Sequence, residues 1–348
     1  MRKVRILGSG LIGTSIALGL AARKFAIQMA DSNDLNSALA QDLVGEAFEG
    51  DADIVIFALP SSQLPLVIAS ELMLNPQATF MDIGSTKIRP QQEIEVYPEL
   101  AMRFCGTHPM AGREIGGPEA ARADLFEGRA WIYTPSAKSD ASSVATVLDL
   151  ITALGATPIR MEIHEHDAAV ALISHLPQIA ASLLAKQLLQ GRQGWMALAG
   201  QGLRDSTRIA ASGTALWEEI ISANKEEIRP LLKRFEGDLH RFIEGLDEKR
   251  TIENLIEEGR RGRQSIPGKH GGRARDYSYL PIVIEDKAGQ LAALFQECAV
   301  AGVNVEDLAI EHSPGQFTGL ITLALSGEDA DKLSEHLSLS GWNVHARR

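Results

Sequence analysis

Residues 4–13 read VRILGSGLIG, and this stretch decides the fold of the first part of the chain. Val4–Leu7 is a short β-rich run, and a helical apolar pattern follows the glycines. A GxGxxG pattern set between a strand and a helix is typical of a dinucleotide-binding turn. Gly8 permits the tight turn, Gly10 lets the backbone approach a diphosphate, and Gly13 lets the helix pack close to the strand. We expect the diphosphate to lie at the helix N-terminus, where free N–H groups favour an anion.

Further short β-rich runs follow before residue 161, and helical patterns separate several of them. They lie at Ile27–Ala30, Asp53–Ala58, Thr79–Asp82, Arg103–Gly106, Ala130–Tyr133 and Thr157–Arg160. The run at 53–58 is apolar throughout, as expected for a strand buried on both faces. The alternation predicts an α/β domain over residues 1–160 with a doubly wound, largely parallel sheet of the Rossmann type.

Asp31 ends the second of these runs, where a carboxylate binds the ribose hydroxyls of the adenosine and would repel a 2′-phosphate. Residues 32–34 offer no arginine that would reverse this preference. The sequence therefore predicts NAD, rather than NADP, as the cofactor. The residues expected at the cofactor are Gly8, Gly10, Leu11, Ile12, Gly13, Asp31, Pro60 and Ser61.

Polar segments follow two of the expected strands, at the edge where open α/β sheets bind ligands. Residues 82–87 read DIGSTK, and residues 106–114 read GTHPMAGRE. His108 is the best candidate for a catalytic base, because an imidazole with a pKa of about 6.5 can accept a proton from an alcohol near neutral pH. A structural histidine is the alternative interpretation.

Residues 161–265 have helical patterns without a strand-like run, so we expect an all-helical domain. The patterns lie at 162–190, 216–223, 225–245 and 247–259. They carry more apolar surface than one amphipathic stripe needs, which favours burial against a second subunit and hence a homodimer. Burial against the first domain is the alternative.

Two polar segments interrupt this helical region, ISHLPQ at 173–178 and GLRDSTRIA at 202–210. His175 lies within an apolar stretch, where a buried structural histidine is the usual interpretation. Arg204 and Arg208 suit a dianionic substrate, because a guanidinium binds a carboxylate bidentately. A structural salt bridge is the alternative for this pair.

The last part of the chain has a different pattern. Glycine, proline and basic residues gather at 260–275, where we expect a linker with its Gly/Pro-rich part at 266–275. Residues 276–348 then show the order strand, helix, strand, strand, helix, strand. The elements are expected at 279–284, 289–301, 303–311, 318–326, 329–339 and 342–345. This order predicts a ferredoxin-like domain.

Composition narrows the functional classes. The formal net charge of −11 argues against a general nucleic-acid binder, which needs a basic field. Cys105 and Cys298 form no CxxC or dense pattern, so a disulfide scaffold is not expected and a reducing cytoplasm is the simplest setting. No signal peptide or membrane span is expected. His164 and His166 are two positions apart and would diverge on a helix, so we expect no metal site.

Taken together, several motifs resemble the TyrA family of prephenate and arogenate dehydrogenases over roughly residues 1–260. They are the glycine turn with Leu11 and Ile12, GSTK at 84–87, THPMAGRE at 107–114, SHLP at 174–177 and RDSTRIA at 204–210. The last 70-odd residues resemble an ACT domain, the ligand-sensing module attached to some members of the family.

The resemblance implies an oxidative decarboxylation of prephenate in tyrosine biosynthesis. His108 would hydrogen-bond the ring hydroxyl and help remove its proton as hydride passes to the nicotinamide. Ser85 would orient His108 and touch substrate or nicotinamide, and Arg208 would grip a substrate carboxylate. Loss of carbon dioxide would then make the ring aromatic.

The resemblance also implies further residues at the pocket. His175 would line it with Trp217 behind, and Glu114 and Asp205 would belong to an ionic network around Arg208. Arg113 follows from adjacency alone. The ACT-like domain would bind an amino acid, tyrosine being the natural candidate, near residues 286–289; a role in association only is the alternative.

Three other functions compete. Arogenate dehydrogenase differs only in the substrate side chain, and no residue decides between the two substrates. A non-catalytic sensor of NAD and an amino acid would not need Ser85, His108 and Arg208 together. A different 2- or 3-hydroxyacid dehydrogenase would not need the segment around His108.

Overall fold

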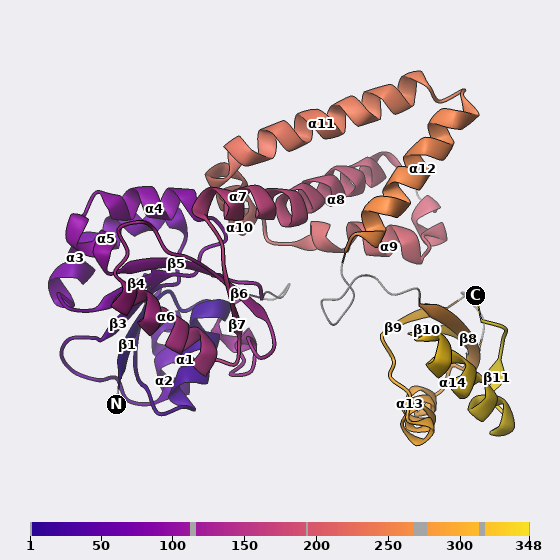
Figure 1. The fold of residues 1–348 in the computed structure, drawn as a ribbon, viewed down its shortest axis with the longest axis horizontal. Helices are drawn as coiled ribbons and strands as arrows, with labels where there is room; N and C mark the ends of the chain where they lie inside the picture. The colour runs from indigo at the N-terminus through magenta and orange to yellow at the C-terminus, as the bar shows by residue number, and fades with distance from the viewer. Residues whose placement is uncertain (1, 112–115, 193, 267–276, 313–316, 348) are drawn as a thin grey trace. The chain divides into compact units, whose positions relative to one another are not determined.

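The computed structural model describes residues 2–111, 116–192, 194–266, 277–312 and 317–347 (Figure 1). Contacts within the chain divide it into two compact units, Met1–Gly237 and Asp238–Arg348. The division falls inside helix α11 (Lys225–Glu244). Arg113 and Glu114, two of the predicted site residues, lie outside the described residues.

A seven-stranded sheet forms the centre of the first unit, and each of its strands was predicted from the sequence. The strands are β1 (Lys3–Leu7), β2 (Ala26–Ala30), β3 (Ile54–Phe57), β4 (Thr79–Asp82), β5 (Phe104–Pro109), β6 (Ala130–Thr134) and β7 (Thr157–Arg160). Their order is β2-β1-β3-β4-β5-β6-β7. Only the β5–β6 pair in this sheet is antiparallel, so the prediction of a largely parallel Rossmann-type sheet is confirmed.

Helices cover both faces of this sheet (Figure 1). One apolar core joins it to α1 (Leu11–Ala21), α2 (Asp34–Val44) and α6 (Ala141–Ala153). A second core joins the other face to α3 (Leu64–Leu74), α4 (Ile88–Glu95) and α5 (Pro98–Met102). All four residues of β3 are buried, which explains why that run is apolar throughout. The order of strands reverses between β1 and β3, and such a switch point opens a crevice at the carboxyl ends of the strands.

The helical region begins with one long rod. It comprises α7 (Ile163–Val170), the π-helical turn η3 (Ala171–His175), α8 (Leu176–Gln187) and the 3-10 turn η4 (Leu188–Gln190). Pro177 follows the π turn and has no N–H for the preceding helical turn, which accounts for the local irregularity. By length and composition this rod could cross a membrane. A single helix of this kind is weak evidence, because core helices of folded domains pass the same test.

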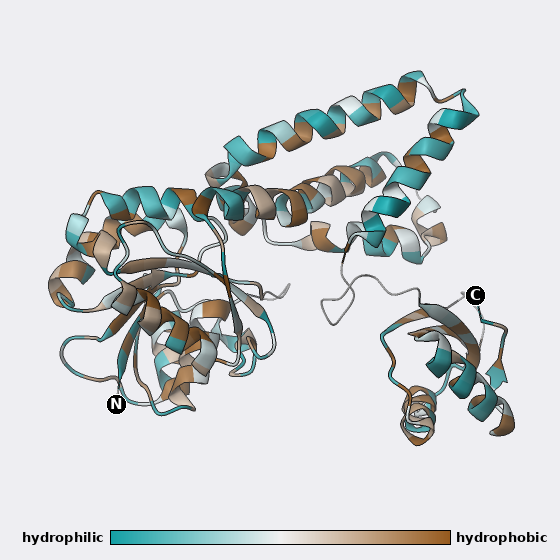
Figure 2. Cartoon of the chain, viewed as in Figure 1, coloured by the Kyte–Doolittle hydropathy of each residue, from teal (hydrophilic) through white to brown (hydrophobic). Residues whose placement is uncertain are grey.

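Three of the remaining helices overlap the patterns expected at 216–223, 225–245 and 247–259, and a further short helix forms over the polar segment at 202–210. They are α9 (Gln201–Thr207), α10 (Thr214–Ala223), α11 and α12 (Lys249–Gln264), with short 3-10 turns η1 (Ser61–Gln63), η2 (Pro118–Ala120), η5 (Trp195–Leu198) and η6 (Arg208–Ala211). Large hydrophobic side chains stay exposed on α8 and α11, among them Leu183, Leu184, Leu239 and Ile243. Figure 2 shows brown, hydrophobic segments along the helices of this region.

The expectation that the linker begins at residue 260 is wrong. Helix α12 continues to Gln264, so Arg260 and Arg261 are helical. Arg260 pairs with Glu257 at 2.8 Å and Arg261 with Glu258 at 3.8 Å, one helical turn earlier. Such i, i+3 ion pairs stabilise the helix and offset the low helix propensity of Gly259 and Gly262. Of the Gly/Pro-rich part expected at 266–275, all but Ile266 lies outside the described residues.

The second unit ends in the predicted ferredoxin-like arrangement. Its elements are β8 (Ser278–Glu285), α13 (Gln290–Ala301), β9 (Asp307–His312), β10 (Thr318–Leu325), α14 (Gly327–Leu339) and β11 (Asn343–Val344). The antiparallel sheet has the order β11-β8-β10-β9, and its core includes Ile282, Leu294, Leu323 and Leu333. Strand β9 begins four residues later than the sequence pattern suggested, at 307 rather than 303.

Candidate active site

The glycine turn between β1 and α1 has the geometry of a dinucleotide cradle. Gly8 has φ +111°, and a Cβ there would lie 2.1 Å from the Ala58 carbonyl oxygen. A Cβ on Gly13 would lie 2.1 Å from the Gly8 carbonyl oxygen, so only glycine allows this packing. A Cβ on Gly10 would meet nothing within 4 Å, and no side chain caps α1. The first N–H groups of α1 are therefore open to a diphosphate.

Asp31 lies beside this turn. Its carboxylate accepts the Ser9 amide at 2.6 Å and the Asn33 amide at 2.8 Å. These bonds fix the carboxylate at the end of β2, where it can bind ribose hydroxyls. The Ser9 hydroxyl is buried without a partner among the described atoms. The residues present thus fit a dinucleotide that carries no 2′-phosphate.

The end of β3 is tied to the helical region by Glu219, which the sequence analysis missed. Its carboxylate accepts Ser61 Oγ at 2.8 Å, the Ser62 amide at 3.0 Å and Ser62 Oγ at 2.8 Å. Burial alone would raise the pKa of Glu219, but the hydrogen bonds from Ser62 and Ser61 outweigh it and hold the pKa below its usual value. Ser61, predicted at the cofactor, is thereby anchored to α10, whereas Pro60 beside it is exposed.

A buried ion pair between Lys87 and Asp82 connects the carboxyl ends of β4 and β5. Lys87 Nζ donates to the Asp82 carboxylate and, at 2.5 Å, to the Thr107 carbonyl. Asp82 also accepts the amides of Thr107 at 3.2 Å and Gly84 at 3.0 Å. Burial lowers the pKa of Lys87, and the neighbouring Asp82 opposes that shift. This network fixes the backbone on both sides of His108.

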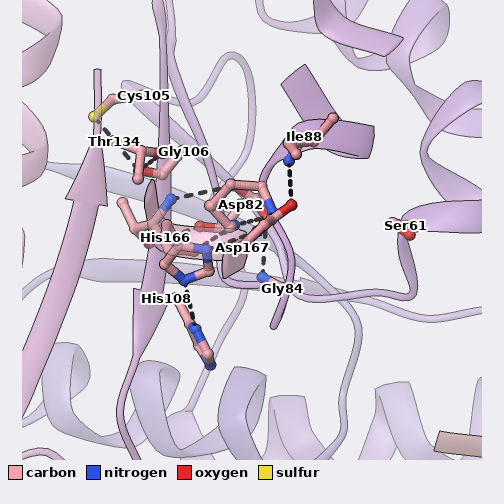
Figure 3. Close-up of polar contacts among 12 residues, drawn as sticks. Ser61, Asp82, Gly84, Ile88, Cys105, Gly106, His108, Thr134, His166 and Asp167 are labelled. Atoms are coloured by element: carbon pink, nitrogen blue, oxygen red, sulfur yellow. Dashed lines mark hydrogen bonds and ion pairs between the residues drawn. The ribbon is translucent and has the colours of Figure 1, made fainter. Parts of the chain in front are cut away.

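His108, the predicted base, is partly buried at the end of β5 (Figure 3). Its Nδ1 lies 2.9 Å from Nε2 of His166, a residue of α7 that is fully buried. Nδ1 of His166 in turn lies 2.7 Å from the Asp167 carboxylate. Burial lowers the pKa of His108 well below 6.5, and His166, Lys87 and His175 lower it further. His108 is therefore an uncharged acceptor near neutral pH.

His175 and Trp217 meet, as the resemblance implied. Their rings are in edge contact with centroids 6.0 Å apart. Nδ1 of the buried His175 lies 3.1 Å from the Asn224 amide nitrogen. Burial lowers the pKa of His175 to about 4, with His166 acting in the same direction against Asp167. The His175 ring is therefore uncharged at physiological pH.

None of the other predicted residues that the structure describes is joined to His108 by a hydrogen bond. Ser85 is half-buried, and within the described ranges His108 is held by His166, not by Ser85. Arg208 and Asp205 are exposed, and Asp205 accepts Gln201 at 2.8 Å. The turn η6 that begins at Arg208 packs against α8, the helix that follows His175.

Four residues escaped the sequence analysis: His166, Asp167, Glu219 and Asn224. His166 and Asp167 end the polar run HEHD at 164–167, at the start of the 162–190 pattern, so no local signal distinguishes them from their polar neighbours. His166 was considered only as a metal ligand and set aside. No group of three or more His, Cys, Asp or Glu side chains able to hold a metal occurs in the described part of the chain.

The fold and this site define an NAD-dependent dehydrogenase with a Rossmann domain and a helical second domain. Residues 11–160 match the nucleotide-binding domain of prephenate dehydrogenase, and residues 162–258 match its dimerization domain. The chain belongs to the prephenate dehydrogenase (TyrA) family, and it carries that family's dimerization domain.

Relatives and solved structures agree along most of the chain. The prephenate dehydrogenase of Bacillus subtilis is 28% identical over 95% of this chain and 94% of its own length. That of Lactococcus lactis is 28% identical over 96% of each. A crystal structure of prephenate dehydrogenase from Aquifex aeolicus, in complex with hydroxyphenyl propionate and NAD+, is 29% identical with a TM-score of 0.68. The match covers 76% of this chain and 99% of that structure.

The lowered pKa of His108 predicts the pH profile of the enzyme. A base works when unprotonated, so kcat/KM should stay level as pH falls from about 8 to about 6, and decline only below that. The profile of kcat/KM, which reports groups of the free enzyme, checks this. An acid limb with an apparent pKa of about 6.5 would contradict the assignment.

Proposed function

We propose that this chain oxidises prephenate with NAD, releasing carbon dioxide and 4-hydroxyphenylpyruvate in the synthesis of tyrosine. The observation that carries the proposal is His108, an uncharged imidazole whose pKa is lowered by burial, held at one ring nitrogen by His166. It stands at the carboxyl edge of a sheet whose glycine turn fits NAD. A dehydrogenase acting on an alcohol needs this pairing of base and hydride acceptor.

His108 accepts the proton of the ring hydroxyl as the carbon bearing it gives up a hydride. NAD, when bound, supplies the nicotinamide that takes this hydride. The bond to the ring carboxylate then breaks, and its electron pair enters the ring and makes it aromatic. The phenolic oxygen finally takes the proton back from His108. Proton and electrons balance without a further reactant.

Other predicted residues bind the substrate in this proposal. Arg208 pairs with a substrate carboxylate, and Asp205 with Glu114 belongs to the ionic network around it. His175 and Trp217, in edge contact, form a wall of the pocket. Ser85 contacts substrate or nicotinamide, and Arg113 lies next to the network. Glu114 and Arg113 are outside the described residues, so their parts rest on the family resemblance.

We also infer that the enzyme is a cytoplasmic homodimer. The dimerization domain and the exposed apolar side chains of α8 and α11 support pairing of two chains. Both cysteines, Cys105 and Cys298, are free and buried, which suits a reducing compartment.

The direct test is NADH formation from prephenate and from arogenate, each with NAD and with NADP. We expect turnover with prephenate and NAD. Turnover with arogenate alone would name the other substrate of the family. Preference for NADP would refute the interpretation of Asp31, and absence of turnover with both substrates would favour a non-catalytic sensor or another hydroxyacid.

Replacement of Arg208 tests how the substrate is held. Arg208→Ala should raise the KM for prephenate by about 10- to 100-fold, as expected for loss of a charge-assisted hydrogen bond, with a smaller change in kcat. Arg250→Ala makes the same change of charge at an exposed position of α12 and should alter KM by less than about 3-fold. An unaltered KM in Arg208→Ala would mean that other groups hold the dianion.

Tyrosine is the proposed effector of the ACT-like domain. Helix α13 begins after Gly289, at φ +89°, without a side-chain cap, so backbone N–H groups there are open to an amino-acid carboxylate. We expect tyrosine to inhibit the full chain without competing with prephenate. A purely competitive pattern in initial-rate kinetics would instead place tyrosine at the active site.

A further inference from the structure

A histidine and an aspartate lie buried directly behind His108 (Figure 3). His166 and Asp167, neighbours on α7, are both 0% exposed. They form a line of hydrogen bonds with His108: 2.9 Å between the two imidazoles and 2.7 Å from His166 to the carboxylate. Burying this many polar groups is unfavourable unless each donor faces an acceptor. The hydrogen bonds along this line must therefore all donate in a consistent direction.

The direction follows from the carboxylate. Oδ1 of Asp167 accepts the Lys87 amide at 2.7 Å, and Oδ2 accepts the Ile88 amide at 2.9 Å. A carboxylate so placed acts as an acceptor, so Nδ1 of His166 donates to it. Nε2 of a neutral His166 is then an acceptor, and Nδ1 of His108 donates to it. This leaves Nε2 of His108 without a proton, the form that a base requires.

The groups packed around this line hold it in place. Asn224 of the α10–α11 junction donates to the Asp167 carbonyl at 2.8 Å and lies 3.1 Å from His175. Lys87, which carries the amide bound by Asp167, places its amine on Asp82. Among the described residues, Lys87 and His175 also act on His108, and both lower its pKa, while Asp167 contacts His166 directly.

We propose that His166, itself fixed by Asp167, is a positioning residue that holds His108 in the tautomer with a free Nε2. This inference rests on the proposed function. It gives a role to His166 and Asp167, which lie outside the sequence motifs that resemble the family. When the substrate O–H bond breaks, the proton forms the N–H bond at Nε2 of His108. The Nδ1 hydrogen bond then places the new positive charge next to His166 and Asp167. The proton returns to the phenolic oxygen after decarboxylation, which restores the starting tautomer.

Kinetics of two variants of His166 test the proposal. His166→Phe keeps a ring but removes the acceptor, and should lower kcat by about 10- to 100-fold while KM for prephenate and the Kd for NAD change little. His166→Gln can still accept from Nδ1 of His108 through its amide oxygen, and should recover a large part of that loss. His164→Phe, the same change at an exposed position of the same helix, should leave kcat unaltered.

The tautomer itself can be read without any substrate. Nitrogen-15 NMR of the histidine-labelled full chain at neutral pH should show His108 protonated at Nδ1 and bare at Nε2, with assignment from His108→Asn. A proton on Nε2 of His108 in the wild-type chain would overturn the proposal, as would an unchanged kcat in a folded His166→Phe chain. If that variant fails to fold, His166→Gln and the wild-type spectrum still decide. A chain that shows this tautomer but does not turn over prephenate would refute the proposed function alone.

Discussion

The carboxylate of Asp167 connects the Rossmann sheet of the first unit to the helical region that follows it. One oxygen accepts the Lys87 amide and the other the Ile88 amide, at the turn where β4 leads into α4. Asp167 itself belongs to α7, the first helix after the Rossmann sheet. The contact therefore joins the carboxyl edge of the sheet to the helical rod, and it also satisfies two backbone amides at the start of α4 that have no partner within the helix. His166, one residue earlier, reaches His108 only because this carboxylate is placed here.

The buried charges around this contact are mutually dependent. Lys87 is among the largest fully buried side chains, and its amine is acceptable in the interior only because Asp82 and the Thr107 carbonyl receive it. The same interactions fix the strand end that presents His108. Loss of one partner would leave a buried charge without compensation, which costs far more than the pair contributes. The site is thus rigid because its polar groups satisfy one another.

A second group of hydrogen bonds connects the segment after β3 to helix α10 in the same unit. Glu219 of α10 receives three donors from Ser61 and Ser62, directly after β3. Trp217, two residues earlier on the same helix, contacts His175. One short helix therefore links the loop beside the dinucleotide cradle to the wall proposed for the substrate.

Local patterns of burial and backbone conformation were enough to predict the strands of the first unit, the glycine turn, the position of Asp31 after the second strand and the ferredoxin-like tail. The sequence also placed His108 at a strand end, whereas the contact between His175 and Trp217 was expected from the family resemblance. It did not determine that α12 would run through Arg260 and Arg261, since i, i+3 ion pairs compete there with nearby glycines. Only the tertiary structure decided which groups contact His108: His166 is 58 positions away, and Glu219 meets Ser61 across 158 positions. Contacts between residues so far apart in the sequence depend on how the helices pack against the sheet. The periodic patterns of a single sequence predict local structure and do not contain that packing.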